Sequence, residues 1–173
     1  DPSETVFFGE KKREVADYTR SFAADGTTVT STTVYFYKTD QRAKDAFYRT
    51  AKTKTVTYKG DIDTDGDGII SDAEVKAAED GLLKQSELFY CGSPDRLSGE
   101  EVADYRVDYR MGRATSTTVY LYKDGRRAKD ANYREALEST VTYYGAVMEK
   151  DADGNMVVKA GAGYGGYTDR AID

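Results

Sequence analysis

Hydrophobic and polar residues alternate with a period of two in several short stretches of the chain. In "TTVYFYK", Val34 and Phe36 fall on one side of the pattern and the neighbouring tyrosines on the other, as in a half-buried β-strand. "TVTYKG" also reads as a strand, and "ADYTRSF" leads into "AADGTT", which has the composition of a turn. We therefore expect several short strands separated by turns.

Apolar residues occur at helical spacing in two other segments. "DQRAKDAFYRTA" carries Ala43, Ala46 and Phe47 at such spacing, which predicts a short surface helix. "DAEVKAAEDGLLKQSELF" has an apolar stripe that begins with Val75 and Ala78 and continues through two leucines, so it predicts a helix that packs on a sheet. Together with the strands, these helices favour an α+β fold.

The chain contains an internal duplication. Residues 31–60 align with residues 116–145 without a gap, and 20 of these 30 positions are identical. "EVADY" at 14–18 recurs at 101–105, so each copy covers about fifty residues. Each copy has the predicted order strand, strand, helix, strand.

The duplication divides the chain into four segments. Two β-rich lobes are expected at residues 1–62 and 99–150, and residues 63–98 join them with an acidic loop and the longer helix. Residues 151–173 begin as a hairpin-like turn and become rich in glycine and tyrosine. This tail is interpreted either as a flexible terminus or as an arm that packs its tyrosines on a partner.

The composition excludes several kinds of site. A net charge of −6 argues against nucleic acid as the main partner, and no apolar run approaches the length of a membrane span. The absence of histidine removes histidine-dependent triads and His-ligated zinc, and the single Cys91 excludes an internal disulfide framework. No phosphate-binding glycine loop is present and no carboxylate pair stands out, so we expect that the protein is not an enzyme.

The acidic stretch "DTDGDGIISDAE" spans residues 63–74, between a predicted strand and a predicted helix. Its first three aspartates occupy alternate positions, so on a tightly curled backbone their carboxylates converge on one point. Gly68 tolerates the positive φ that such a turn requires. Carboxylates held this close repel one another strongly without a cation, and the pattern therefore predicts a cation site.

This stretch resembles the calcium-binding loop of the EF-hand family, D-x-D-x-D-G-x₅-E. The ligand set that the resemblance implies for one Ca²⁺ is Asp63, Asp65, Asp67, Ile69, Ser71 and Glu74. In that set Ile69 would act through its carbonyl oxygen, Ser71 directly or through water, and Glu74 through two oxygens. The resemblance also implies that Ile70 points inward, toward a core or a pairing strand.

The sequence around the loop differs from that of an EF-hand. "KTVTYKGDI" before the loop reads as a strand, so the helix that normally enters the loop is not expected. Loops in such non-helical surroundings occur in dockerin-like and other extracellular calcium modules. A second turn has Asp151, Asp153 and Asn155 at suitable spacing, but Met156 replaces the glycine and Ala162 the glutamate. We interpret it as a degenerate loop or a plain hairpin tip.

Two groups of residues recur in both copies. The recurring tyrosines are interpreted as sheet residues, with a platform for a protein or sugar partner as the alternative; they are Tyr18/Tyr105, Tyr35/Tyr120, Tyr37/Tyr122, Tyr48/Tyr133 and Tyr58/Tyr143. The recurring charged residues are Arg42, Lys44, Asp45 and Arg49, with counterparts Arg127, Lys129, Asp130 and Arg134. A solvated helix face explains them, with phosphate or carboxylate binding as the alternative.

These patterns predict a non-catalytic, calcium-binding module for binding or adhesion, in which one structural Ca²⁺ fixes the arrangement of two lobes. A protein or carbohydrate partner is expected, without nucleic acid and without membrane insertion. The lone loop and the N-terminal "DPSETVFF", with neither an initiating Met nor a leader, favour a processed extracellular or cell-surface chain. The alternatives are an architectural or linker subunit of a larger assembly, and an ancillary domain of a secreted enzyme.

Overall fold

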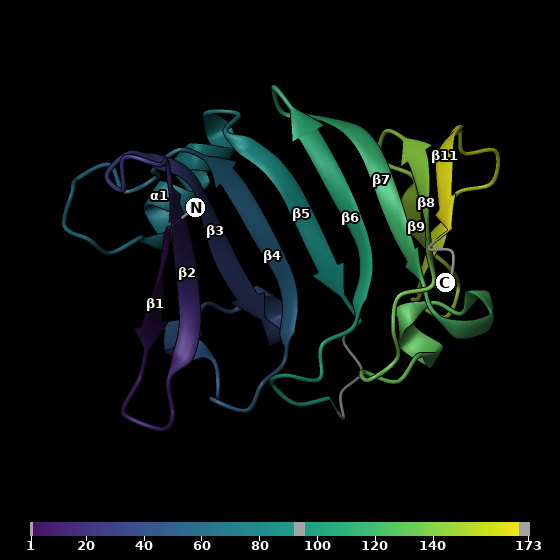
Figure 1. The fold of residues 1–173 in the computed structure, drawn as a ribbon, viewed down its shortest axis with the longest axis horizontal. Helices are drawn as coiled ribbons and strands as arrows, with labels where there is room; N and C mark the ends of the chain where they lie inside the picture. Colours follow the sequence, from purple (N-terminus) through teal and green to yellow (C-terminus); the bar gives the residue numbers. More distant parts are fainter. Residues whose placement is uncertain (1, 92–95, 170–173) are drawn as a thin grey trace.

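The computed structural model describes residues 2–91 and 96–169 (Figure 1). The strands are β1 (Ser3–Phe8), β2 (Val15–Phe22), β3 (Val29–Tyr37), β4 (Lys52–Lys59), β5 (Lys84–Tyr90), β6 (Ala103–Arg110), β7 (Arg113–Leu121), β8 (Ser139–Tyr144), β9 (Met148–Lys150), β10 (Met156–Val158) and β11 (Tyr164–Asp169). The helical elements are α1 (Asp72–Asp80) and the 3₁₀ turns η1 (Lys38–Asp40), η2 (Ala43–Asp45), η3 (Lys123–Gly125) and η4 (Ala128–Asp130).

In the described residues, one antiparallel sheet dominates the fold. Nine strands lie side by side in the order β1 to β8 and then β11, so almost every strand pairs with its neighbour in the chain. The short strands β9 and β10 form a separate hairpin that interrupts this order. Figure 1 shows α1 at the end of the sheet that β1 to β4 form and the hairpin at the end near β8 and β11.

The predicted α+β fold with two separate lobes is wrong. β4, the last strand of the first copy, pairs with β5, and β5 pairs with β6 of the second copy. The two copies therefore share one continuous sheet. The fold is mainly β, because α1 is the one α-helix in the part of the chain that the structure describes.

The helix predicted in each copy is also wrong, and 3₁₀ turns take its place. In the first copy Asp17 on β2 accepts hydrogen bonds from Arg42 and from the backbone amide of Ala43. Ala43 is buried against the sheet, whereas Phe47, which was expected on the apolar helix face, is 64% exposed. These contacts hold the segment against β2 in place of the hydrogen bonds of a continuous helix.

The longer predicted helix is only partly correct. α1 ends at Asp80, and Gly81 donates its backbone hydrogen bond to the Ala77 carbonyl. Leu82 then adopts a φ of +60°, which breaks the helical path, and β5 begins two residues later. The backbone groups of "KQSELF" are paired with β4 and β6 instead of with a preceding helical turn.

The repeating unit has four strands, one more than the sequence predicts. Phe7 on β1 lies opposite Ala16, and Tyr90 on β5 lies opposite the equivalent Ala103, with a register shift just before this pair in both cases. β1 and β5 are therefore equivalent first strands of the two copies. Their side chains differ enough that the match is visible only from the pairing.

The Gly/Tyr-rich segment, expected as a tail, forms the ninth strand of the sheet. β11 pairs with β8 as β5 pairs with β4: Tyr164 lies opposite Tyr143, Lys84 lies opposite Tyr58, and the register shifts at this same point in both pairs. By its register, β11 is the first strand of a third unit. Residues 170–173 lie outside the described residues.

Equivalent positions on the sheet are covered by different connectors. In the first copy, residues from the sheet and from the loop and helix between β4 and β5 form one core, namely Tyr18, Val34, Val56, Tyr58, Ile62, Ile70, Val75 and Ala78. In the second copy Tyr105, Val107 and Val119 pack instead with Met148, Met156 and Val158 of the β9–β10 segment. The loop with α1 and the hairpin thus occupy corresponding places.

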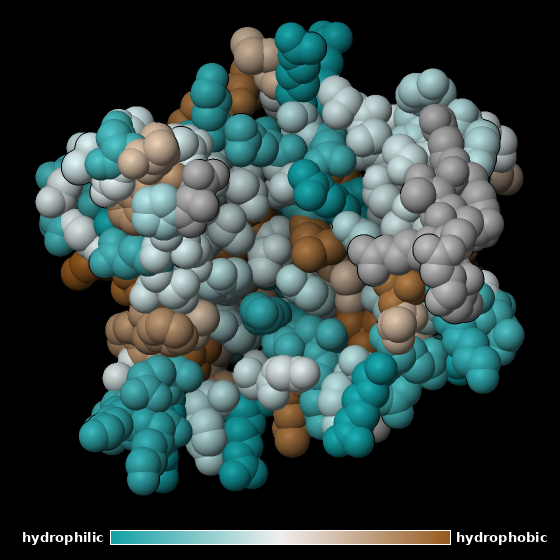
Figure 2. Space-filling view, viewed as in Figure 1, coloured by the Kyte–Doolittle hydropathy of each residue, from teal (hydrophilic) through white to brown (hydrophobic). Residues whose placement is uncertain are grey.

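The view of the surface in Figure 2 is mostly teal or pale, with hydrophobic residues in small separated groups. Threonine side chains pair across neighbouring strands, as Thr33 does with Thr57 and Thr118 with Thr142. No helix in residues 2–91 and 96–169 is long and apolar enough to cross a membrane.

Substitutions in either copy should shift one common unfolding transition, because the sheet is continuous. Val34 is fully buried and the equivalent Val119 is 3% exposed. Val34→Ala and Val119→Ala should each reduce the free energy of unfolding by about 2 kcal/mol. Urea titration followed by circular dichroism measures this, with the exposed Phe47→Ala as a control that changes stability little. Two separate transitions, each responding to one variant, would contradict a single cooperative sheet.

The β2–β3 turn contributes stability that depends on pH. The Asp25 carboxylate accepts hydrogen bonds from the Thr28 hydroxyl and from the amides of Thr28 and Thr27, which lower the pKa of Asp25 to about 2. The unfolded value is about 4, so this contribution is complete above pH about 4 and is lost as the pH falls toward 2. Asp25→Asn should therefore lower the urea midpoint at neutral pH, and the gap to wild type should close over this window. A gap independent of pH would refute the assignment.

Candidate metal centre

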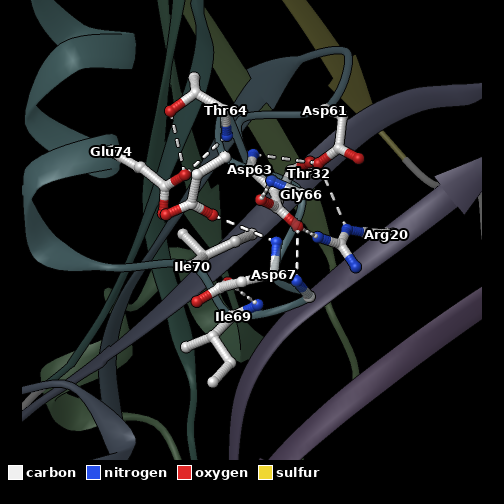
Figure 3. Close-up of polar contacts among 12 residues, drawn as sticks. Arg20, Thr32, Asp61, Asp63, Thr64, Gly66, Asp67, Ile69, Ile70 and Glu74 are labelled. Atoms are coloured by element: carbon white, nitrogen blue, oxygen red, sulfur yellow. Dashed lines mark hydrogen bonds and ion pairs between the residues drawn. The ribbon is translucent and has the colours of Figure 1, made fainter.

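The acidic loop 63–74 lies between the end of β4 and the start of α1. Carboxylate oxygens of Asp63, Asp65 and Asp67 all lie within 4.8 Å of one another. The strand predicted before the loop is confirmed as β4. Figure 3 shows Glu74 beside Thr64 on one side of the loop, and Arg20 beside Asp61 and Asp63 on the other.

Backbone amides inside the loop hold the first aspartate in place. Asp63 accepts hydrogen bonds from the amides of Gly66, at 2.7 Å, and of Gly68, at 3.0 Å. Gly66 has a φ of +73° and Gly68 a φ of +82°, so the curl uses the conformations that glycine tolerates best. Desolvation acts in the opposite direction, but these hydrogen bonds and Arg20 lower the pKa of Asp63. The carboxylate is therefore kept ionised.

Shorter turns of the same kind orient the next two aspartates. The carboxylate of Asp65 accepts from the amide of Asp67, and the carboxylate of Asp67 accepts from the amide of Ile69. Each side chain is thereby folded back over the loop, and the three carboxylates remain clustered. The Ile69 side chain is 64% exposed, so it contributes little to packing.

Glu74 is 7% exposed and caps the start of α1. Its Oε2 accepts from the amide and hydroxyl of Ser71, while the Ser71 hydroxyl accepts from the Glu74 amide. Its Oε1 accepts from the amide and hydroxyl of Thr64. The hydrogen bonds from the amides of Ser71 and Thr64 lower the pKa of Glu74 to about 2. Glu74 therefore links the beginning of the loop to the helix that follows it.

Apolar anchors and one tyrosine attach the loop to the sheet. Ile62 and Ile70 are each 2% exposed and belong to the core of the first copy, so the prediction that Ile70 points inward is confirmed. The hydroxyl of Tyr18 on β2 donates a hydrogen bond to the Gly68 carbonyl. The loop is therefore fixed at both its beginning and its middle.

Arg20 on β2 is a site residue that the sequence did not predict. Its Nη2 lies 2.8 Å from Asp63, and its Nε lies 3.3 Å from Asp61. The position is far from the loop in the chain and reaches it only through sheet pairing. The repeat contains a usable signal, however, because the second copy has Val107 at the position equivalent to Arg20 and has no acidic loop.

The six predicted ligand residues lie in one loop, but their side chains do not all converge on one point. The carboxylates of Asp63, Asp65 and Asp67 form a cluster, whereas both oxygens of Glu74 bind groups of Thr64 and Ser71. In the second turn, Asp151 Oδ1 accepts from the amides of Asp153 and Asn155 at the tip of the β9–β10 hairpin. Within the described residues, only the first three aspartates form a cluster of this kind.

Comparison with known proteins gives no family for this chain. No family model, curated protein or solved structure matches it. Any function must therefore be inferred from the residues and geometry of the chain itself.

Replacing Arg20 should destabilise the loop when no divalent cation is present. Arg20 is the cation that offsets the repulsion of Asp63 and Asp61, and its side chain is 11% exposed. In buffer with EDTA, Arg20→Met should unfold at a lower urea concentration than wild type and should speed amide exchange at Gly66 and Gly68. Arg110→Met, at an exposed arginine, is the control. Equal effects of the two substitutions would show that Arg20 does not support the loop.

Proposed function

We propose that the loop 63–74 binds one calcium ion and that the ion has a structural role. The observation that supports this most directly is the cluster of Asp63, Asp65 and Asp67 carboxylates over a backbone curled at Gly66 and Gly68. Hard cations such as Ca²⁺ take six to eight oxygen ligands at flexible geometry, and every side-chain donor here is an oxygen. The residues that would hold the ion are Asp63, Asp65, Asp67, Ile69 through its carbonyl, Ser71 and Glu74.

The chemistry of the donors favours calcium over the transition metals. The chain has no histidine and the loop has no cysteine, so the nitrogen and sulfur ligands typical of zinc and copper sites are missing. Magnesium demands a stricter octahedral geometry and usually retains several waters. A ligand set with four carboxylates and no nitrogen or sulfur suits calcium better.

The ion would stabilise the connector that covers the first copy. It would offset the repulsion among the aspartates and join the loop to α1 through Glu74, whose hydrogen bonds already link Thr64 to the helix start. Val75 and Ala78 of α1 pack on the sheet, so ordering the loop also orders this covering layer. The proposed function is thus a non-catalytic binding or adhesion module of an extracellular or cell-surface protein, where free calcium is high.

A second candidate function is an architectural subunit of a larger assembly. It is favoured by the repeated four-strand unit. β1 and β5 have the same register with the strand that follows them, and β5 and β11 have the same register with the strand before them in the sheet. Repeats that stack by strand pairing are used as extended scaffolds.

Calorimetric titration should detect one calcium ion bound per chain. Asp63→Ala and Glu74→Gln should each weaken binding at least about tenfold, because each removes ligand charge from the same site. At free calcium one hundred times the Kd, the ion should add about 2.7 kcal/mol to the free energy of unfolding of the wild type.

Asp151→Asn is the matched control, since it changes an acidic turn that lacks the clustered carboxylates, and it should bind calcium like the wild type. Absence of calcium uptake at millimolar concentration would refute the proposal. Uptake that is unaffected by Asp63→Ala and Glu74→Gln would place the ion elsewhere and would refute it as well.

A further inference from the structure

A cavity of about 550 Å³ lies on the second copy, between the ends of β5 and β6 and the β9–β10 hairpin. Its walls include Phe89, Tyr105, Arg127, Lys129 and Met156. Phe89 and Tyr105 are stacked, with ring centroids 4.5 Å apart. This volume is in the range that binds small organic groups or a short stretch of peptide.

The first copy has equivalent residues at these positions, and there they are covered by the connector between β4 and β5. Four polar residues in or beside the cavity have exact counterparts by the repeat: Asp104 matches Asp17, Tyr105 matches Tyr18, Arg127 matches Arg42, and Lys129 matches Lys44. The internal duplication therefore provides a reference for the cavity within the same chain.

In the first copy these groups hold the connector. The Tyr18 hydroxyl donates to the Gly68 carbonyl. Arg42 donates from Nη2 to the Ile70 carbonyl at 3.0 Å, and its side chain is 6% exposed. Lys44 Nζ lies 2.7 Å from the Asp72 carboxylate. Tyr18 on β2, Arg42 just before η2 and Lys44 in η2 thus bind the connector. Their acceptors are two backbone carbonyls and one carboxylate, all within residues 68–72.

In the second copy the equivalent donors lack these acceptors. Tyr105 lines the cavity, whereas Tyr18 donates to the Gly68 carbonyl, and among the described residues Arg127 Nη2 is buried without the carbonyl acceptor that Ile70 gives to Arg42. Arg127 Nη2 does lie 2.8 Å from Asp104, but only Nε of Arg127 donates to that carboxylate with good geometry. Lys129 approaches Asp130 no closer than 3.7 Å. Arg127 therefore keeps its ion pair with Asp104 but lacks the second acceptor that Ile70 gives to Arg42, and a carbonyl group of a ligand would supply it.

The hairpin explains why the acceptors are missing. Met148, Met156 and Val158 of the hairpin pack on the apolar cluster that includes Val107, and the first copy has Arg20, bound to its acidic loop, at the position of Val107. The hairpin therefore covers the apolar part of this face and lines the cavity together with Arg127. Asp151 also lines the cavity; its Oδ1 accepts from the amides of its own turn, and these hydrogen bonds together with the charge of Lys129 lower the pKa of its carboxyl.

We propose that this cavity binds a short acidic peptide segment of a partner protein, in the way that the first copy binds its own residues 68–72. One peptide carbonyl would accept from Tyr105 and a second from Arg127, and an acidic side chain two residues later would lie at Lys129. Apolar side chains of the segment would lie against Phe89 and Met156. A peptide is favoured over a small acid, because the reference contacts are mainly to backbone carbonyls.

The test uses a peptide with the sequence of residues 68–73, GIISDA, blocked at both ends and titrated into the full chain by calorimetry. Submillimolar binding is expected. Tyr105→Phe, which keeps the ring and removes the hydroxyl, and Lys129→Ala, at an exposed side chain, should each weaken binding at least about fivefold. Lys150→Ala, at an exposed lysine outside the cavity, should leave binding unchanged. A peptide with the change D72N should bind as weakly to the wild type as the original peptide binds to Lys129→Ala.

Absence of binding at millimolar peptide overturns the proposal, as does binding that Tyr105→Phe and Lys129→Ala leave unchanged. Succinate serves as the small-acid probe. If succinate binds and the peptide does not, the cavity is a site for small carboxylates and the peptide proposal fails. Calcium uptake at the loop 63–74 is measured separately, so loss of one activity is not mistaken for loss of the other.

Discussion

Backbone pairing between β4 and β5 is the contact on which the rest of the molecule depends. It joins the last strand of the first copy to the first strand of the second, and the pairing of β8 with β11 repeats it with the same register shift. Because a slip of one residue would turn every side chain to the opposite face, this conserved register gives both copies the same inward-facing positions. Tyr18 and Tyr105 therefore occupy matching places on one sheet.

On this common sheet, the two connectors make the copies chemically different. Between β4 and β5 the chain carries the five carboxylates of the acidic loop and a helix capped by Glu74, and Arg20 on β2 provides a counter-charge. Between β8 and β11 it carries a short hairpin whose apolar residues Met148, Met156 and Val158 pack on the cluster that includes Val107. Tyr18 and Arg42 donate hydrogen bonds to the connector of the first copy, whereas the equivalent Tyr105 and Arg127 line a cavity in the second. The sheet is therefore the common scaffold, and the connectors carry the residues that differ between the copies, as is usual for functional loops on a scaffold.

The strands with clear alternation were predictable, because a period of two is a local property of the side chains. The acidic loop was predictable for a similar reason: its acidic residues are close in the sequence, and Gly68, with a φ of +82°, has the backbone conformation that glycine tolerates best. Two helix predictions failed where contacts between distant segments prevailed. Ala43 and Ala46 have helical spacing, but Asp17 holds the backbone at Ala43 against β2. Residues 84–89 continue an apolar helical pattern, but pairing with β4 and β6 makes them a strand.

By itself, the sequence determined the duplication, most of the strands and the oxygen-rich loop, since each depends on residues within a short window. Only the tertiary structure decided that the copies share one sheet, that Arg20 reaches Asp63, and that Tyr105 and Arg127 line a cavity while their counterparts bind the connector. These features depend on which strands become neighbours and on what covers them. That choice is made by hydrogen bonding and packing between segments far apart in the chain, which no local pattern of side chains records.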